Sequence, residues 1–182
     1  MGIFNIKKRG YFKLSKADFK TKKDDFELVS VKFSGNFFEK LSQETEKENS
    51  TEELAQITNT ASIILFKNKV EIVYNPSEIE LEEDKFITLI NQKLNWINNN
   101  KSLINIEITK KLLPLKNENW LEENETKISE IEFVKRIRLA SILFLEDGSS
   151  ELIFNDGNLF WEHQIVADLS AKNKLIAINI RG

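Results

Sequence analysis

The sequence predicts an α+β fold, in which a mainly antiparallel sheet ending in a four-stranded C-terminal meander packs against two or three helices. The meander follows from two Asp-Gly pairs, Asp147-Gly148 and Asp156-Gly157, which separate short apolar runs. Asp-Gly between apolar runs is a strong hairpin signal, because glycine accepts a positive φ without steric cost. The helices follow from the middle of the chain, where apolar residues recur every three or four positions and share one helix face.

The chain before the helices contains three strand-like segments and a polar one. Residues 26–38 alternate apolar and polar side chains, which is typical of a strand. Residues 42–53 are polar, and we expect a loop or an exposed helix there. Residues 61–66 and 70–74 are rich in β-branched side chains, and the short connection between them predicts a hairpin. Pro76 ends its second strand, since proline cannot donate to a β-ladder.

Two helices are predicted next. Ser77 and Glu80 have the spacing of a capping box, which marks the start of the first helix. Asn98-Asn99-Asn100 favours a stop, because asparagine suits turn and left-handed conformations. The second helix is predicted to begin at Ser102 and to end at Pro114, and the short polar turn between the helices predicts antiparallel packing. The apolar stripe of the first helix consists of Phe86, Ile90, Leu94 and Ile97.

The capping-box pair Ser129 and Glu132 predicts a third, short helix. The meander follows it. Its four predicted strands are 139–145, 151–154, 159–167 and 175–180. Because side chains alternate along a strand, Trp161, His163 and Ile165 are expected to share one face of the third of these strands.

The composition excludes several classes of site. The 182 residues, 41% of them hydrophobic, suffice for one sizeable core. Without cysteine and with one histidine, the chain cannot hold a disulfide, a cysteine-based zinc or redox centre, or a multi-histidine metal site. It has no phosphate-binding glycine loop and no EF-hand pattern, so we expect no metal and no cofactor. No apolar run approaches the roughly 20 residues of a spanning helix and no signal segment is apparent, so we expect no transmembrane segment and a cytoplasmic location.

Charge is unevenly distributed along the chain. Residues 1–23 carry eight basic groups and one acidic group, although the whole chain has a formal net charge of −3. We interpret residues 1–25 as a basic N-terminal extension and residues 26–182 as a single α+β domain. The extension is either an arm that binds nucleic acid or an anionic membrane surface, or a solvated leader whose aromatic side chains pack on the core.

The candidate binding residues include the only histidine. His163 is the one side chain whose unperturbed pKa lies near neutrality, and Trp161 would provide an aromatic platform beside it. The alternative is a structural histidine packed on Trp161. A catalytic dyad needs a second group, and no serine lies in a strand–turn–helix elbow, so no catalytic residue is assigned. Trp120 lies in a polar stretch, where an indole either packs at the core edge or anchors a partner.

A motif in the C-terminal part resembles a known pattern. Asp156-Gly157-Asn158-Leu159-Phe160-Trp161-Glu162-His163 is similar to the signature of an uncharacterised bacterial domain family of unknown function, which runs Asp-Gly, Leu-Phe-Trp, Gly-His. The resemblance covers about residues 85–182 and includes Trp120 and the final Gly182. It implies protein binding, because related domains are likened to toxin-immunity proteins. Glu162 stands where the pattern has Gly, and this departure weakens a shared ligand site around His163.

We therefore expect a non-enzymatic, cytoplasmic bacterial protein that binds another protein, as an immunity protein that occludes its partner would. The candidate binding residues are Trp161, His163, Asp156 and Trp120. Two alternatives stay open at this point. One is a small-ligand binder or hydrolase-like enzyme centred on His163, and the other is an anionic-surface binder that acts through residues 1–23.

Overall fold

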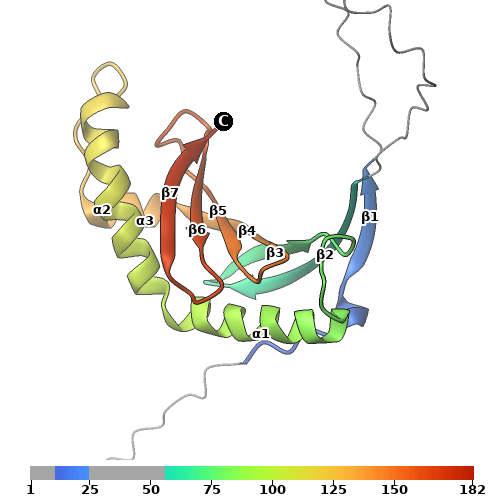
Figure 1. Ribbon diagram of the computed structural model, residues 1–182. Helices are drawn as coiled ribbons and strands as arrows, with labels where there is room; N and C mark the ends of the chain where they lie inside the picture. The colour runs from blue at the N-terminus through green and yellow to red at the C-terminus, as the bar shows by residue number, and fades with distance from the viewer. Residues whose placement is uncertain (1–10, 25–55) are drawn as a thin grey trace, which may run out of the picture.

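A seven-stranded sheet, with its strands in sequential order, forms the centre of the structure (Figure 1). The computed structural model describes residues 11–24 and 56–182. Neighbouring strands are antiparallel, except that β3 and β4 are parallel. The α+β class with a mainly antiparallel sheet is confirmed, whereas the strand predicted at 26–38 and the polar segment 42–53 lie outside the described residues. The strands are β1 (Lys20–Asp24), β2 (Gln56–Leu65), β3 (Asn68–Tyr74), β4 (Arg138–Phe144), β5 (Ser150–Asn155), β6 (Gln164–Leu169) and β7 (Leu175–Arg181).

Three helices form the crossover between the parallel strands β3 and β4. They are α1 (Glu83–Asn99), α2 (Lys101–Asn119) and α3 (Glu130–Arg136). The prediction that the first two helices pack antiparallel is wrong. Only Asn100 separates them, and a single residue cannot reverse the direction of a helix. Figure 1 shows α1 lying across the sheet and α2 turning away from it to run beside β7.

The predicted start of the first helix is also wrong. Ser77 lies in a turn, where its N–H and its hydroxyl both donate to Asn75 Oδ1, and α1 begins only at Glu83. The capping box of the third helix is confirmed, because Ser129 and Glu132 exchange side-chain and backbone hydrogen bonds. The two pairs have the same spacing, but only the second one is followed directly by helical backbone.

Pro114 does not end the second helix, which continues to Asn119. Proline in a helix interior costs about 3 kcal/mol, because it removes a hydrogen bond and crowds the preceding turn. In α2 the proline is exposed, while Leu112 and Lys116 on either side of it are buried. The packing of Leu112 and the hydrogen bonds of Lys116 to Trp120 O and Glu125 Oε2 offset the cost. The stop at Asn100 is confirmed, since α1 ends there.

One face of the sheet carries the hydrophobic core. A row of paired residues crosses this face from β2 to β7, and each contributes an apolar side chain. The row consists of Ala61, Ile72, Ile142, Leu152, Ala167 and Ile178. The predicted stripe of α1 is buried in the same core, as are Ile104 and Ile108 of α2. Burying one such side chain stabilises the fold by about 1.5–3 kcal/mol, so this face is the one that the helices cover.

The described part of the N-terminal segment is attached to the core. β1 pairs with β2, and the rings of Phe19 and Tyr74 meet edge to face at 5.0 Å. The N–H of Leu14 donates to Asn91 Oδ1 at 2.7 Å, and Asn91 Nδ2 donates back to Leu14 O at 2.8 Å. Residues 11–24 are thereby held on α1 and β2. Among the described residues, no helix is both long and apolar enough to cross a membrane.

The C-terminal meander has the four predicted strands, β4 to β7, but its third strand begins late. β6 starts at Gln164 rather than at residue 159. Residues 156–163 form a loop between β5 and β6, the 156–163 loop. The prediction that Trp161 and His163 share a strand face with Ile165 is therefore wrong.

Candidate functional site

Asp156 organises the 156–163 loop from the inside. Its side chain is buried, with 4% of the residue exposed. Asp156 Oδ2 accepts a hydrogen bond from the N–H of Phe160 at 2.6 Å, and Oδ1 accepts one from the N–H of Asn158 at 3.2 Å. A carboxylate that accepts two backbone hydrogen bonds bends the chain around itself. The two N–H groups are then not available to a neighbouring strand. Asp156 thus supports the loop beneath the surface.

The backbone of the loop is bent at four residues. Positive φ angles occur at Gly157 (62°), Asn158 (61°), Trp161 (54°) and Glu162 (69°). A left-handed conformation costs a residue with a side chain about 1–2 kcal/mol, whereas glycine adopts it freely. The glycine that the resembled pattern has at position 162 would therefore remove strain there. The bend sends Phe160 into the core and turns Trp161 outward, which is why this segment is not a strand.

Three of the four predicted site residues meet at one surface. The ring of Trp120 lies 4.8 Å from that of Trp161 and 5.4 Å from that of His163, measured between centroids. Trp120 also packs edge to face on the buried ring of Phe160 at 5.5 Å. We call Trp120, Trp161 and His163 the aromatic surface. Trp161 is its most accessible member, with 54% of the residue exposed.

His163 is half-buried against the end of the last strand. Its Nδ1 lies 3.3 Å from Trp161 O, and its backbone N–H donates to Phe160 O. The backbone of Gly182 approaches the ring so closely that a Cβ there would lie 2.2 Å from His163 Cδ2. No carboxylate in the described part of the chain hydrogen-bonds the imidazole. The same part holds no group of three or more His, Asp and Glu side chains placed to bind a metal ion.

A buried lysine fixes the position of Trp120. Lys116 is 1% exposed, and its Nζ donates to Trp120 O at 2.6 Å and to Glu125 Oε2 at 2.5 Å. The hydrogen bond from Lys116 is the main reason that the pKa of Glu125 lies below its ordinary value. Glu125 Oε2 also accepts the N–H of Glu122, which closes the loop after α2. Trp120 is therefore held at its backbone by an ion pair.

Arg136 joins this ion pair to the 156–163 loop. Its Nε donates to Gly157 O at 2.9 Å, and its Nη2 donates to Asn158 O at 3.0 Å. Its Nη1 lies 3.7 Å from Glu125 Oε1. One guanidinium on α3 thus connects the loop that carries Trp120 to the loop that carries Trp161, so the two indoles keep a constant relative position.

Lys116, Glu125 and Arg136 were not identified in the sequence as site residues. Each is an ordinary charged residue, for which solvent exposure is the usual state. Lys116 does lie one helical turn before Trp120, and this spacing is the one local signal that connects it to the site.

A family model matches residues 56–180, more than half of the chain. Its description reads "Uncharacterized protein conserved in bacteria (DUF2262)". The match begins at β2, earlier than the resemblance from about residue 85, and it includes the aromatic surface and the three residues that support it. No curated protein and no protein of known structure matches the chain.

Proposed function

The chain belongs to this family of uncharacterised proteins conserved in bacteria, and we propose that it acts by binding another protein through the aromatic surface. The observation that carries the proposal is the exposure of Trp161, which presents more than half of its area to solvent from a strained backbone conformation. Tryptophan is strongly enriched among residues that dominate binding energy. Backbone strain of this kind gathers at functional sites, where the rest of the structure has to maintain it.

The rigidity of the surface supports the same proposal. Trp161 packs on Trp120, and the loops of both residues are tied together through Arg136 and Glu125. A side chain that is held in place before binding loses little conformational entropy when the partner arrives. The neighbouring Glu162 and Gln164 are exposed, which gives the apolar centre a polar border, as in protein interfaces.

A narrower version of the proposal is an immunity-type protein that occludes its partner in the bacterial cytoplasm. The resemblance of residues 156–163 to a signature found in domains likened to immunity proteins supports it. The gene for the partner would then lie next to the gene for this chain. The products of adjacent genes are accordingly the first proteins to test.

The experiment is a binding measurement between the purified full chain and each of those gene products. Trp161→Ala should weaken the interaction by about thirtyfold or more, because truncating a hot-spot residue costs at least about 2 kcal/mol. Ile64→Thr is the matched control, since Ile64 is 69% exposed on β2, away from the aromatic surface. Its effect should stay within about twofold, as expected for a residue outside the interface.

Circular dichroism and thermal unfolding establish that both variants are folded. Equal losses for Trp161→Ala and Ile64→Thr, or the absence of any stoichiometric partner among the gene products, would contradict the proposal.

A further inference from the structure

We infer that the free edge of β7, together with the adjacent side of α2, accepts an extended acidic segment of the partner protein by strand addition. This inference rests on the proposed protein-binding function and deepens it, because it names the kind of segment that is bound. It is argued from the sheet order, the groove beside β7, the charges that line this groove and its position relative to the aromatic surface.

β7 is the last strand of the sheet. It pairs with β6 on one side, and no described strand covers its other side. Its sequence from Leu175 to Arg181 is rich in isoleucine and contains neither proline nor glycine. Proteins usually protect such an edge with charges, prolines or a covering element, because it is a template for another strand. Apart from one register shift near Leu175, the ladder of β7 is regular, so its outer edge can pair over residues 177–181.

A groove of about 500 Å³ lies along this edge, between β7 and α2. Its lining comes from residues 175–179 on one side and from Glu107, Lys110 and Lys111 on the other. Figure 1 shows β7 beside the first part of α2, from which the rest of the helix leans away. Because an added strand lies about 4.8 Å from its neighbour, it would occupy the groove only beyond the residues at which α2 itself contacts β7.

The charge of the groove selects its occupant. Lys110 and Lys111 line its helical side against one acidic residue, Glu107. Lys174 lies outside this lining and directly precedes β7. None of the three lysines forms an ion pair within the described residues. A second copy paired with β7 around a two-fold axis would bring these lysines toward their own equivalents, which is unfavourable. An extended segment with acidic side chains would be attracted instead.

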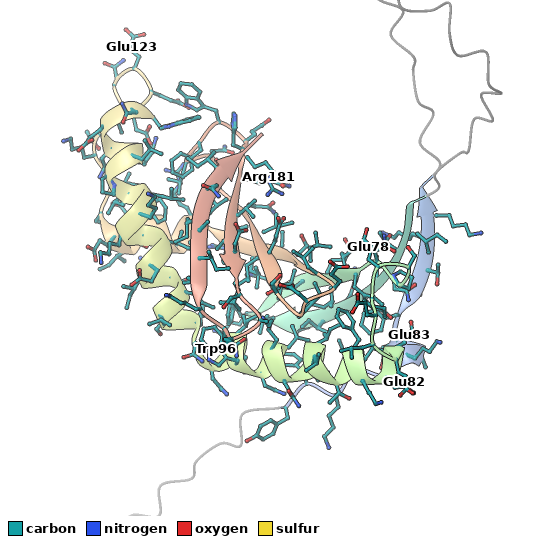
Figure 2. All side chains as sticks on the ribbon, in the orientation of Figure 1. Glu78, Glu82, Glu83, Trp96, Glu123 and Arg181 are labelled. Carbon is teal, nitrogen blue, oxygen red and sulfur yellow. The ribbon has the colours of Figure 1, made fainter. Side chains whose placement is uncertain are left out.

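The groove leads to the aromatic surface. α2 ends at Asn119, directly before Trp120, and β7 ends beside Gly182, which contacts His163. In Figure 2, Arg181 at the end of β7 and Glu123 in the loop after α2 lie toward the same end of the molecule. Four residues of extended chain span about 13 Å. A segment of that length reaches from the middle of β7 to its end, so a single partner can occupy both places.

The test uses synthetic peptides and the full chain. The probe is a capped Glu-Val-Glu-Val-Glu-Val-Glu peptide, followed by backbone amide NMR shifts and hydrogen exchange. We expect shifts and slower exchange in residues 175–181. Lys110→Glu combined with Lys111→Glu should weaken binding about tenfold, because each substitution replaces an attraction to the acidic peptide with a repulsion. The matched control, Lys69→Glu with Lys135→Glu, changes the net charge equally on exposed residues away from the groove.

Several results would overturn the inference. One is the absence of shifts in β7 at millimolar peptide. Another is equal binding of a Glu-Val-Pro-Pro-Glu-Val-Glu peptide, in which one of the two adjacent prolines always lacks an N–H on the side that faces β7. A third is self-association of the chain through β7 without peptide, because a second copy would then be the occupant. Partner binding that depends on Trp161 but not on Lys110 and Lys111 would remove the inference and leave the proposed function standing. Peptide binding at β7, combined with a Trp161→Ala variant that keeps full affinity for the partner, would contradict the proposed function and leave this inference standing.

Discussion

Replacing Lys116 by methionine should destabilise the fold and release Trp120 from its fixed position. Lys116 is 1% exposed, and its Nζ donates to Trp120 O and to Glu125 Oε2. Methionine keeps the unbranched apolar stem but removes both donors. The variant therefore separates the charge and hydrogen bonds of Lys116 from its packing.

The size of the expected loss in the free energy of unfolding depends on how Glu125 is compensated after the substitution. Removing one partner of a buried ion pair costs about 3–5 kcal/mol, because the other charge is left without compensation. The side chain of Glu125 is 24% exposed, and Arg136 stays 3.7 Å from its Oε1. Water and Arg136 therefore compensate part of the loss. We expect Lys116→Met to lower the free energy of unfolding by about 2–3 kcal/mol at pH 7.

The effect should depend on pH in a defined direction. The hydrogen bond from Lys116 lowers the pKa of Glu125 in the folded chain below its ordinary value of 4.5. A group with a lowered folded-state pKa contributes stability above its unfolded pKa and loses that contribution as the pH falls through the folded value. The difference between wild type and Lys116→Met should therefore shrink as the pH falls below 4.5.

Urea unfolding of the two single variants, Lys116→Met and Glu125→Gln, and of the double variant measures the coupling directly. We expect a coupling energy of about 1–2 kcal/mol at pH 7 and a smaller one at pH 3. The control is Lys110→Met, an exposed lysine on the same helix, which should change stability by less than about 0.5 kcal/mol. A coupling energy that is negligible or independent of pH would refute the reasoning.

Two further predictions concern glycine and a second buried lysine. Gly157→Ala should lower the free energy of unfolding in urea by about 2 kcal/mol more than Gly148→Ala does. Both glycines have a positive φ, but a Cβ at position 157 would lie 2.6 Å from Arg136 O, whereas one at position 148 would meet nothing within 4 Å. Equal losses of stability would contradict this geometric reason. Lys93 is 6% exposed, and burial lowers its pKa to about 8. Lys93→Met removes this buried charge but also the hydrogen bond from Nζ to Ser170 O at 2.6 Å, so it should raise stability at pH 7 by at most about 1 kcal/mol. This gain should decline from pH 8 to 10, because the unfolded wild-type chain then keeps a proton that the folded chain has released, which stabilises the folded wild type. A gain that is the same at pH 7 and pH 10 would exclude the charge as its cause.

Local signals predicted most of the secondary structure. The buried stripe of α1, the capping box of α3 and the turn at Gly148 all depend on residues a few positions apart, and all are present. The tight hairpin turn predicted at Gly157 is wrong, because β6 begins only at Gln164. The errors arose where distant contacts outweigh a local pattern. At Pro114, burial of neighbouring residues outweighs the break expected from proline.

The 156–163 loop shows the same competition at the candidate site. The sequence predicts a strand from residue 159, but the carboxylate of Asp156 accepts two backbone N–H groups that a ladder would have used. Residue types alone singled out Trp120, Trp161 and His163. That the three form one surface, fastened through Arg136, depends on chain segments that are far apart in the sequence.

By itself, the sequence determined the α+β class, the buried face of α1, the Asp147-Gly148 turn and the aromatic residues of the site, because periodicity, capping and turn chemistry act between near neighbours. Only the tertiary structure decided the parallel pairing of β3 with β4, the turn between α1 and α2 and the burial of Lys116. It also placed the outer edge of β7 beside α2, where no strand of the described residues pairs with it. These features depend on which apolar faces meet across the fold, and strand partners are chosen by that burial rather than by any pattern along the chain.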